Sequence, residues 1–173
     1  MRRVRYQVAM SLDGYIAGPN GEFDWIVSDP DIDFAALFAQ FDTLLMGRKT
    51  FLSTVQQTGA GAWPGVDVVV FSRTLSPDDY PSVTIVNDDP AEYVRSLKAK
   101  QGKDIWLFGG GELFRTLLDA GLVDTVEPAV VPVLLGGGVP MLPSPATRAR
   151  LTLSNHRLYP KSGIMLLEYR VSR

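Results

Sequence analysis

The sequence predicts an α/β fold of three layers, α/β/α, with a mostly parallel central sheet and an antiparallel hairpin at the C-terminus. Up to residue 120, apolar β-branched runs alternate with segments of helical periodicity, a pattern typical of parallel α/β domains. Beyond that point the chain is rich in strand-forming residues, and a proline–glycine turn at 160–163 separates two alternating runs. The 173 residues suit one domain, expected to span 1–173 without a linker or repeat.

The strands are predicted from runs of β-branched, aromatic and other apolar residues. They are expected at 4–10, 43–46, 66–71, 83–86, 105–108, 123–131, 151–159 and 164–171. Pro128 falls inside one of them. Because proline is confined to the edges and bulges of sheets, that strand is predicted to lie at an edge or to carry a bulge.

The helices are predicted where apolar residues recur at helical spacing behind a suitable first turn. They are expected at 31–40, 48–55, 90–100 and 112–120, the third with Pro90 at its start. The segments 11–30, 56–65 and 134–145 are rich in glycine and proline and are expected to be loops. Loops as long as the first of these usually carry function in a compact domain.

Composition excludes several classes of function. The net charge is −2 and no long basic run exists, so nucleic acid and anionic membranes are poor candidates as main partners. The absence of cysteine removes thiolate chemistry, and the single histidine, His156, rules out a multi-histidine metal site, so no metal is expected. No transmembrane span or signal core is apparent, and a cytoplasmic location is expected. A bound cofactor could supply the missing reactivity.

The most informative segment is the glycine triplet 109–111, which lies between an apolar strand and a helical pattern. Glycines let a ligand approach the backbone, and the N-terminus of the following helix attracts anions such as phosphate. Phe114 stands where a G-x-G-x-x-G fingerprint needs its third glycine, and no P-loop pattern exists. A tight turn without a ligand is the alternative.

Two further turns favour the same ligand. Gly47, Arg48, Lys49 and Thr50 again place glycine between a strand and a helix, now with two cations in the first turn. The positive end of the helix dipole repels cations at a helix N-terminus, and a bound anion would offset that repulsion. Ser72–Arg73 follows another apolar strand. Three such strand ends are expected to bind one nucleotide across the carboxyl edge of the sheet.

These segments resemble the dihydrofolate reductase-like superfamily. The resemblance rests on Met46–Phe51 (MGRKTF) and Phe108–Leu113 (FGGGEL), and it extends over nearly the whole chain. The segments Ala9–Ala17 (AMSLDGYIA) and Pro132–Pro140 (PVLLGGGVP) are most similar to the branch that includes the reductase domain of the bifunctional riboflavin-biosynthesis deaminase-reductase. The resemblance implies a dihydrofolate reductase-like fold, NADPH as cofactor and a homodimer.

The resemblance also implies a set of cofactor-binding residues. Ala9 and Ile16 are expected beside the nicotinamide, and Ser72 and Arg73 at the adenosine 2′-phosphate. The other expected cofactor-binding residues, in the two turns at the phosphates, are Gly47, Arg48, Lys49, Thr50, Phe108, Gly109, Gly110, Gly111, Glu112 and Leu113. The loop 11–25 would correspond to the mobile active-site loop of folate reductases.

The catalytic and substrate-binding residues are less clearly marked. Asp31, Asp33 and Asp13 are the candidate catalytic carboxylates, with helix capping the alternative for the first two and turn formation for the third. Trp25 is a candidate for stacking on a flat heteroaromatic substrate, and packing under the loop is its alternative. The glycine loop with Gly136 and Gly137 is a candidate for close approach to substrate, with a permissive turn as the alternative.

The predicted function is an NADPH-dependent reductase that transfers hydride to a pterin-like or aminopyrimidine substrate. The closest reaction that the resemblance implies is reduction of 5-amino-6-(5-phosphoribosylamino)uracil in riboflavin biosynthesis. One alternative is a dihydrofolate reductase, although residues 21–25 lack the Leu-Pro-Trp typical of that branch. The other is a nucleotide-binding module without catalysis. The partners expected are a small-molecule substrate and a second copy of the chain, paired through the exposed edge of the C-terminal hairpin.

Overall fold

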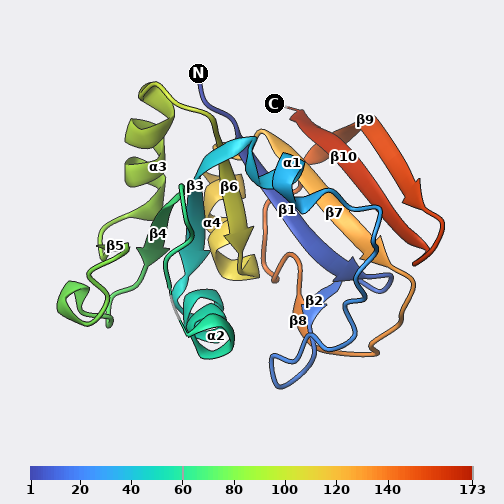
Figure 1. Cartoon of the computed structure of the whole chain (residues 1–173). Helices are drawn as coiled ribbons and strands as arrows, with labels where there is room; N and C mark the ends of the chain where they lie inside the picture. The colour runs from blue at the N-terminus through green and yellow to red at the C-terminus, as the bar shows by residue number, and fades with distance from the viewer. Residues whose placement is uncertain (60, 173) are drawn as a thin grey trace.

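The central element is a mixed sheet of eight strands in the order β5-β4-β3-β6-β1-β7-β10-β9. The computed structural model describes residues 1–59 and 61–172. Figure 1 shows the twisted sheet crossing the molecule from β5 to the C-terminal hairpin. In chain order its strands are β1 Val4–Ser11, β3 Phe41–Gly47, β4 Asp67–Phe71, β5 Thr84–Val86, β6 Asp104–Gly109, β7 Thr125–Val131, β9 Arg150–Tyr159 and β10 Ile164–Ser172.

Helices cover both faces of this sheet, which confirms the predicted three layers. They are α1 Phe34–Phe38, α2 Arg48–Thr58, α3 Pro90–Ala99 and α4 Gly111–Asp119, with a 3₁₀ turn at Pro77–Asp79. Residues of α3 and α4 pack into one apolar cluster, and residues of α1 and α2 pack into another on the opposite face. Strands β1, β3, β4, β5, β6 and β7 run parallel, whereas β10 is antiparallel to both β7 and β9.

Side-chain alternation along the strands builds these two clusters. Val4 and Tyr6 of β1 belong to the α3–α4 side, where the Tyr6 ring stacks on Phe114 of α4 at 3.9 Å. Arg5 points to the other face, with its guanidinium 4.8 Å from the centre of the Phe41 ring. Burial raises the pKa of the Tyr6 phenol far above its usual range. Tyr6 is therefore a packing residue of the core.

The connections that follow β3 and β6 leave the sheet on opposite faces and create a topological switch point between these two strands. Strand β3 leads into α2, which buries Phe51 on one face, and the adjacent strand β6 leads into α4, which buries Phe114 on the other. Neighbouring strands whose connections leave to opposite sides form a topological switch point, where open α/β sheets bind ligands at the carboxyl ends of the strands. The switch point of this sheet lies between β3 and β6 (Figure 1).

The structure corrects two expectations about secondary structure. The helix predicted over 31–40 is only α1, Phe34–Phe38, because a turn closed by Asp29 precedes it and Asp33 caps it. The strand with Pro128 is β7, which lies inside the sheet. Its pairing with β10 is found on either side of the proline, at Ala129–Leu166 and Val126–Tyr169. This arrangement suits a residue that has no N–H to donate.

Two of the predicted loops contain more structure than expected. The loops 11–30 and 134–145 each contribute a short strand, β2 Tyr15–Ala17 and β8 Val139–Pro140, which pair with each other. In the predicted loop 56–65, α2 continues to Thr58, and residue 60 lies outside the described residues. No helix in the described part of the chain is both long enough and apolar enough to span a bilayer.

Candidate active site

Three predicted phosphate-binding turns meet at the carboxyl edge of the sheet. Gly47 at the end of β3 pairs in register with Phe71, the last residue of β4. On its other side, Met46 pairs with Gly109 at the end of β6. The turns that start with Gly47, Ser72 and Gly109 are therefore neighbours, although the sequence separates them widely.

The turns after β3 and β6 lie in contact with each other. A Cβ added at Gly109 or Gly110 would lie 3.4 or 3.3 Å from Oγ1 of Thr50. A Cβ added at Gly47 would lie 3.7 Å from the backbone nitrogen of Gly110. The peptide bond between Gly109 and Gly110 is cis. We call the two adjoining glycine turns, at Gly47 and at Gly109 and Gly110, the cradle.

The helices that start at this cradle differ from the other helices in how they begin. In α1, α3 and the 3₁₀ turn, the side chains of Asp33, Asp89 and Ser76 accept a hydrogen bond from the first turn. The N-caps of α2 and α4 are Gly47 and Gly110, which offer no side-chain acceptor. The first N–H groups of two adjacent helices are thus left for another acceptor, and a phosphate oxygen has the right chemistry.

Three exposed cations lie in the turns after β3 and β4. Arg48 and Lys49 are exposed in the first turn of α2. Arg73 is exposed in the turn after β4, where the buried hydroxyl of Ser72 accepts hydrogen bonds from the N–H groups of Thr74 and Leu75. Within residues 1–59 and 61–172 none of these three cations forms an ion pair. Ser72 shapes its turn, while Arg73 is available to a ligand.

The predicted nicotinamide side lies beyond β6, along the end of β1. Pairing between β1 and β6 ends at Tyr6–Leu107, whereas β1 continues along β7 to Ser11. Ala9 is half-buried in this extension. The β2–β8 ribbon, which carries Ile16, reaches the start of α4, since a Cβ added at Gly111 would lie 2.7 Å from the carbonyl oxygen of Pro140.

Asp13 connects the exit of β1 to the second glycine loop. Its carboxylate accepts hydrogen bonds from the Ser11 hydroxyl at 2.7 Å and from the N–H groups of Leu135 at 3.1 Å and Gly136 at 2.7 Å. The Ser11 hydroxyl, helped by the two backbone donors, holds the pKa of Asp13 below its usual range. Two predicted site residues, Asp13 and Gly136, are thereby brought into direct contact.

The other acidic candidates lie along the loop before α1. Asp33 caps α1 through the N–H of Ala36 at 2.9 Å, and Asp31 forms an exposed ion pair with Lys161 at 2.8 Å. The buried acid of this segment is Asp29, whose carboxylate accepts from the N–H of Ser162 at 2.9 Å. Hydrogen bonding from Ser162 lowers the pKa of Asp29. This loop is thus fastened to the C-terminal hairpin.

The aromatic candidate Trp25 lies on the same face of the sheet as α1. Trp25 is half-buried in a cluster with Ala9 and Leu166, and its indole N–H donates to the carbonyl of Glu22 at 3.2 Å. Trp63 packs against Phe108, with ring centres 5.5 Å apart. Gly137 has open space where a side chain would be. The roles of Trp25, Gly136 and Gly137 toward substrate stay predictions.

A buried polar group on β1 and β7 was not anticipated from the sequence. Arg5 donates two hydrogen bonds to the carboxylate of Glu127, both at 2.8 Å, and the Thr125 hydroxyl donates a third at 2.6 Å. Burial by itself would lower the pKa of Arg5, but the contact with Glu127 outweighs it, and the pKa is raised. Gln7 lies between these residues and Ala9 on the same face of β1. In the sequence, the only signal of this polar face was that Arg5, Gln7 and Ala9 alternate with apolar residues along the predicted strand.

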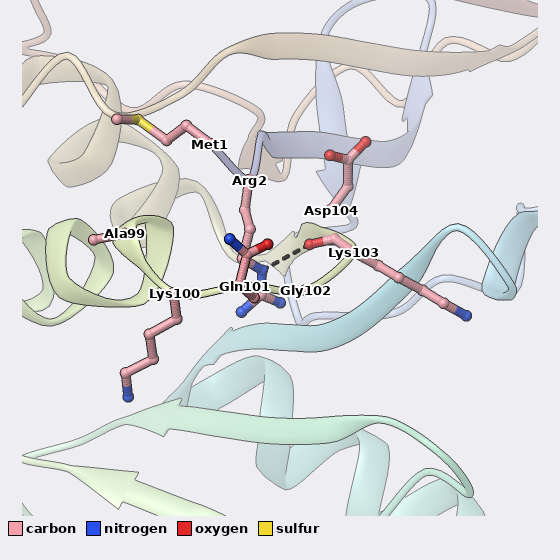
Figure 2. A pocket seen from close by; sticks show the side chains of 8 residues that line it. All are labelled: Met1, Arg2, Ala99, Lys100, Gln101, Gly102, Lys103 and Asp104. Carbon is pink, nitrogen blue, oxygen red and sulfur yellow. Dashed lines mark hydrogen bonds between the residues drawn. The ribbon is translucent and has the colours of Figure 1, made fainter.

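The polar hollow in Figure 2 lies at the opposite edge of the sheet. It encloses about 210 Å³ between the N-terminal residues and the 99–104 segment, next to the amino ends of β1 and β6. Arg2 fills its centre, donating to the carbonyl of Lys103 at 2.7 Å and pairing with Asp42. Lys100 and Lys103 extend in different directions (Figure 2). The hollow is separate from the cradle.

Comparison with known proteins places the chain among reductase-like domains. A family model described as the RibD C-terminal domain matches residues 2–164. An uncharacterised protein of Bacillus subtilis (strain 168), YyaP, is 37% identical over 97% of this chain and 94% of its own length. The riboflavin biosynthesis protein RibD of Mycobacterium tuberculosis (strain ATCC 25618 / H37Rv) is 30% identical over 79% of this chain, which spans only 44% of that protein.

Solved structures extend the likeness to the whole fold. A protein from Shewanella sp. PV-4, provisionally assigned to riboflavin biosynthesis, superposes with a TM-score of 0.81 at 28% identity, covering 99% of both chains. The dihydrofolate reductase of Enterococcus faecalis, solved in complex with NADP(H) and RAB-propyl, gives a TM-score of 0.72 at 16% identity over 99% of this chain and 97% of its own. The predicted dihydrofolate reductase-like fold is confirmed.

Proposed function

This chain belongs to the RibD C-terminal domain family, and on that premise we propose that it is an oxidoreductase, an NADPH-dependent reductase of a pyrimidine-type heterocycle. The observation that carries the proposal is the cradle at the switch point, where two helix N-termini without side-chain caps lie together near the exposed cations Arg48, Lys49 and Arg73. The closest reaction is reduction of 5-amino-6-(5-phosphoribosylamino)uracil, the step named for reductases of riboflavin synthesis.

The residues of the cradle fit a phosphorylated dinucleotide. The glycines of these turns carry no side chain that would hold a pyrophosphate away from the backbone, and Arg48, Lys49 and Thr50 supply charge and a hydroxyl. Arg73 would bind the 2′-phosphate of the adenosine and so select NADPH over NADH. NADPH, when bound, supplies a hydride. The free stretch of β1 around Ala9 would then hold the nicotinamide end.

The acidic residues at this edge serve to position loops. Asp13 and Asp29 have lowered pKa values and accept hydrogen bonds, so both are ionised at neutral pH and have no proton to donate. Glu127 is held by Arg5. We therefore propose that the proton needed after hydride transfer comes from solvent, with Asp13 ordering the glycine loop beside the substrate.

The cofactor proposal is tested by titrating NADPH and NADH against the intrinsic tryptophan fluorescence. The Arg73→Ala variant is expected to weaken NADPH binding about 10- to 100-fold, because a charge-assisted hydrogen bond is worth roughly 1.5–3 kcal/mol, and to leave NADH binding nearly unchanged. Arg148→Ala, which removes an exposed arginine beside Leu118 and Ser172, is the matched control. Equal loss for both cofactors would show that Arg73 does not bind the 2′-phosphate.

A substrate panel separates the remaining functions. Loss of NADPH absorbance with aminopyrimidines supports the proposed reaction, whereas turnover of dihydrofolate and tight binding of methotrexate would favour a dihydrofolate reductase. Because the chain spans under half of RibD, the substrate of that protein is a starting point for the panel. NADPH binding without turnover of any heterocycle would support the non-catalytic alternative.

We also propose a homodimer formed through β9. This edge strand runs over ten residues and exposes Leu151, Leu153 and Leu158 by 43%, 49% and 53%, whereas the opposite edge strand, β5, has only three residues. A long apolar edge is a template for antiparallel pairing about a two-fold axis. Light scattering should show a dimer that Leu153→Lys converts to monomer, and a monomeric wild type would refute it. The cytoplasmic location stays a prediction.

A further inference from the structure

Trp63 is the one tryptophan whose indole N–H has no acceptor within the described part of the chain. The indole of Trp25 donates to the carbonyl of Glu22 at 3.2 Å, and that of Trp106 donates to the carbonyl of Gln7 at 3.0 Å. Trp63 is half-buried, and its Nε1 atom is accessible to solvent, because the only shielded side-chain nitrogen or oxygen without a partner among the described residues is Oε1 of Gln7. This donor is therefore within reach of a ligand.

The segment around Trp63 holds the indole in a defined place. Residues 61–66 contain no other side chain that can form a hydrogen bond. The N–H of Val66 donates to the carbonyl of Trp63 at 3.2 Å and closes a tight turn. Gly61 lies against Phe51 of α2, since a Cβ added there would lie 2.5 Å from Cε2 of that ring. The turn thus presents a single, pre-positioned donor from an otherwise apolar segment.

The Trp63 ring belongs to an aromatic circuit of four side chains, Phe38, Trp63, Phe108 and Trp106. The centre of the Trp63 ring lies 5.1 Å from that of Phe38 in α1 and 5.5 Å from that of Phe108. Trp106 completes the circuit at 5.3 Å from both of these phenylalanines. Phe108 is followed directly by Gly109 of the cradle. Trp63 therefore borders the cradle on the α1 face of the sheet.

The same face carries the stretch of β1 proposed for the nicotinamide. Trp106 of the aromatic circuit donates to the carbonyl of Gln7, which precedes Ala9 by two residues. The circuit thus adjoins β1 where this strand parts from β6. A flat heterocycle that faces the nicotinamide at Ala9 would have these aromatic side chains beside it, and such surroundings suit a ring.

We propose that Trp63 is a specificity-determining residue for the heterocyclic substrate, its indole N–H donating a hydrogen bond to a ring carbonyl oxygen. This inference rests on the proposed function. An indole N–H donates and never accepts, so the polarity of the contact is fixed. A heterocycle with an amino group in place of that carbonyl brings two donors face to face and is bound more weakly.

The test compares two pyrimidines of nearly equal shape, 5,6-diaminouracil and 2,4,5,6-tetraaminopyrimidine, in which amino groups replace both carbonyls. Calorimetry with NADP⁺ bound should show that the wild type prefers diaminouracil by about tenfold or more. Trp63→Phe keeps an aromatic ring against its neighbours and removes the donor. It should weaken diaminouracil binding about three- to tenfold and change tetraaminopyrimidine and NADP⁺ binding by less than about twofold.

Trp25→Phe is the matched control. It removes an indole N–H that the protein itself uses, so the ratio of the two pyrimidine affinities should stay that of the wild type. The same ratio in Trp63→Phe as in the wild type, no preference in the wild type, or no binding of diaminouracil to it would each overturn the inference. Absence of NADPH oxidation while the Trp63-dependent preference persists would instead count against the proposed reaction alone.

Discussion

Gly111 is the position where one added methyl group should disturb both the fold and the cradle. It is the first residue of α4 and is buried. A Cβ there would lie 2.7 Å from the carbonyl oxygen of Pro140, 2.9 Å from Cδ of Pro143 and 3.0 Å from the carbonyl oxygen of Met141. Two of these atoms are backbone and the third is in a proline ring, so none can rotate away. The β8 segment or the start of α4 must move by several tenths of an ångström.

The cost of Gly111→Ala follows from that geometry. Overpacking of this kind costs about 1–3 kcal/mol, and each kcal/mol lowers Tm by roughly 2–4 °C in a chain of this size. We expect a Tm lower by about 4–8 °C for a midrange cost, measured by circular dichroism. NADPH affinity should fall as well, because the first N–H groups of α4 move away from the phosphates.

A matched control isolates the steric effect of the added methyl group. Gly137→Ala places its methyl group in open space on the β7–β8 loop and should leave Tm unchanged. If Gly111→Ala melted within about 1 °C of the wild type, the contact between the β8 segment and α4 would not constrain the helix. If it melted early but bound NADPH normally, the start of α4 would not be part of the phosphate site.

Two further predictions concern the loop before α1. The lowered pKa of Asp29 means that its stabilisation is present above its unfolded pKa of about 3.9 and is lost as pH falls through the folded value. Asp29→Asn should therefore lower Tm at pH 7, and the difference from wild type should shrink in acid; a constant difference would disprove the linkage. Asp33→Ala removes the α1 cap and should cost about 1 kcal/mol in denaturant unfolding without altering turnover, and a loss of turnover would instead support a catalytic role.

Local signals in the sequence were enough to predict the layers and to propose a cofactor side. Apolar β-branched runs marked the parallel strands, and glycine directly after a strand marked the turns at Gly47 and Gly109. Each of these signals involves residues next to one another in the chain. The carboxyl ends of parallel strands share one edge, so the meeting of the turns followed from the fold class.

The proposed substrate side depends on contacts that no local signal contains. Asp13 is bound by Gly136, 123 positions later, and Asp29 by Ser162, 133 positions later. Whether a carboxylate caps a helix, fastens a loop or faces a ligand depends on the donors that reach it, and these come from distant segments. The same holds for Gln7, since only the packed sheet reveals a carboxamide oxygen that no donor within residues 1–59 and 61–172 reaches. The sequence by itself determined which main strands and helices form and which turns are candidates for binding phosphate, and the tertiary structure alone decided which polar groups are already satisfied.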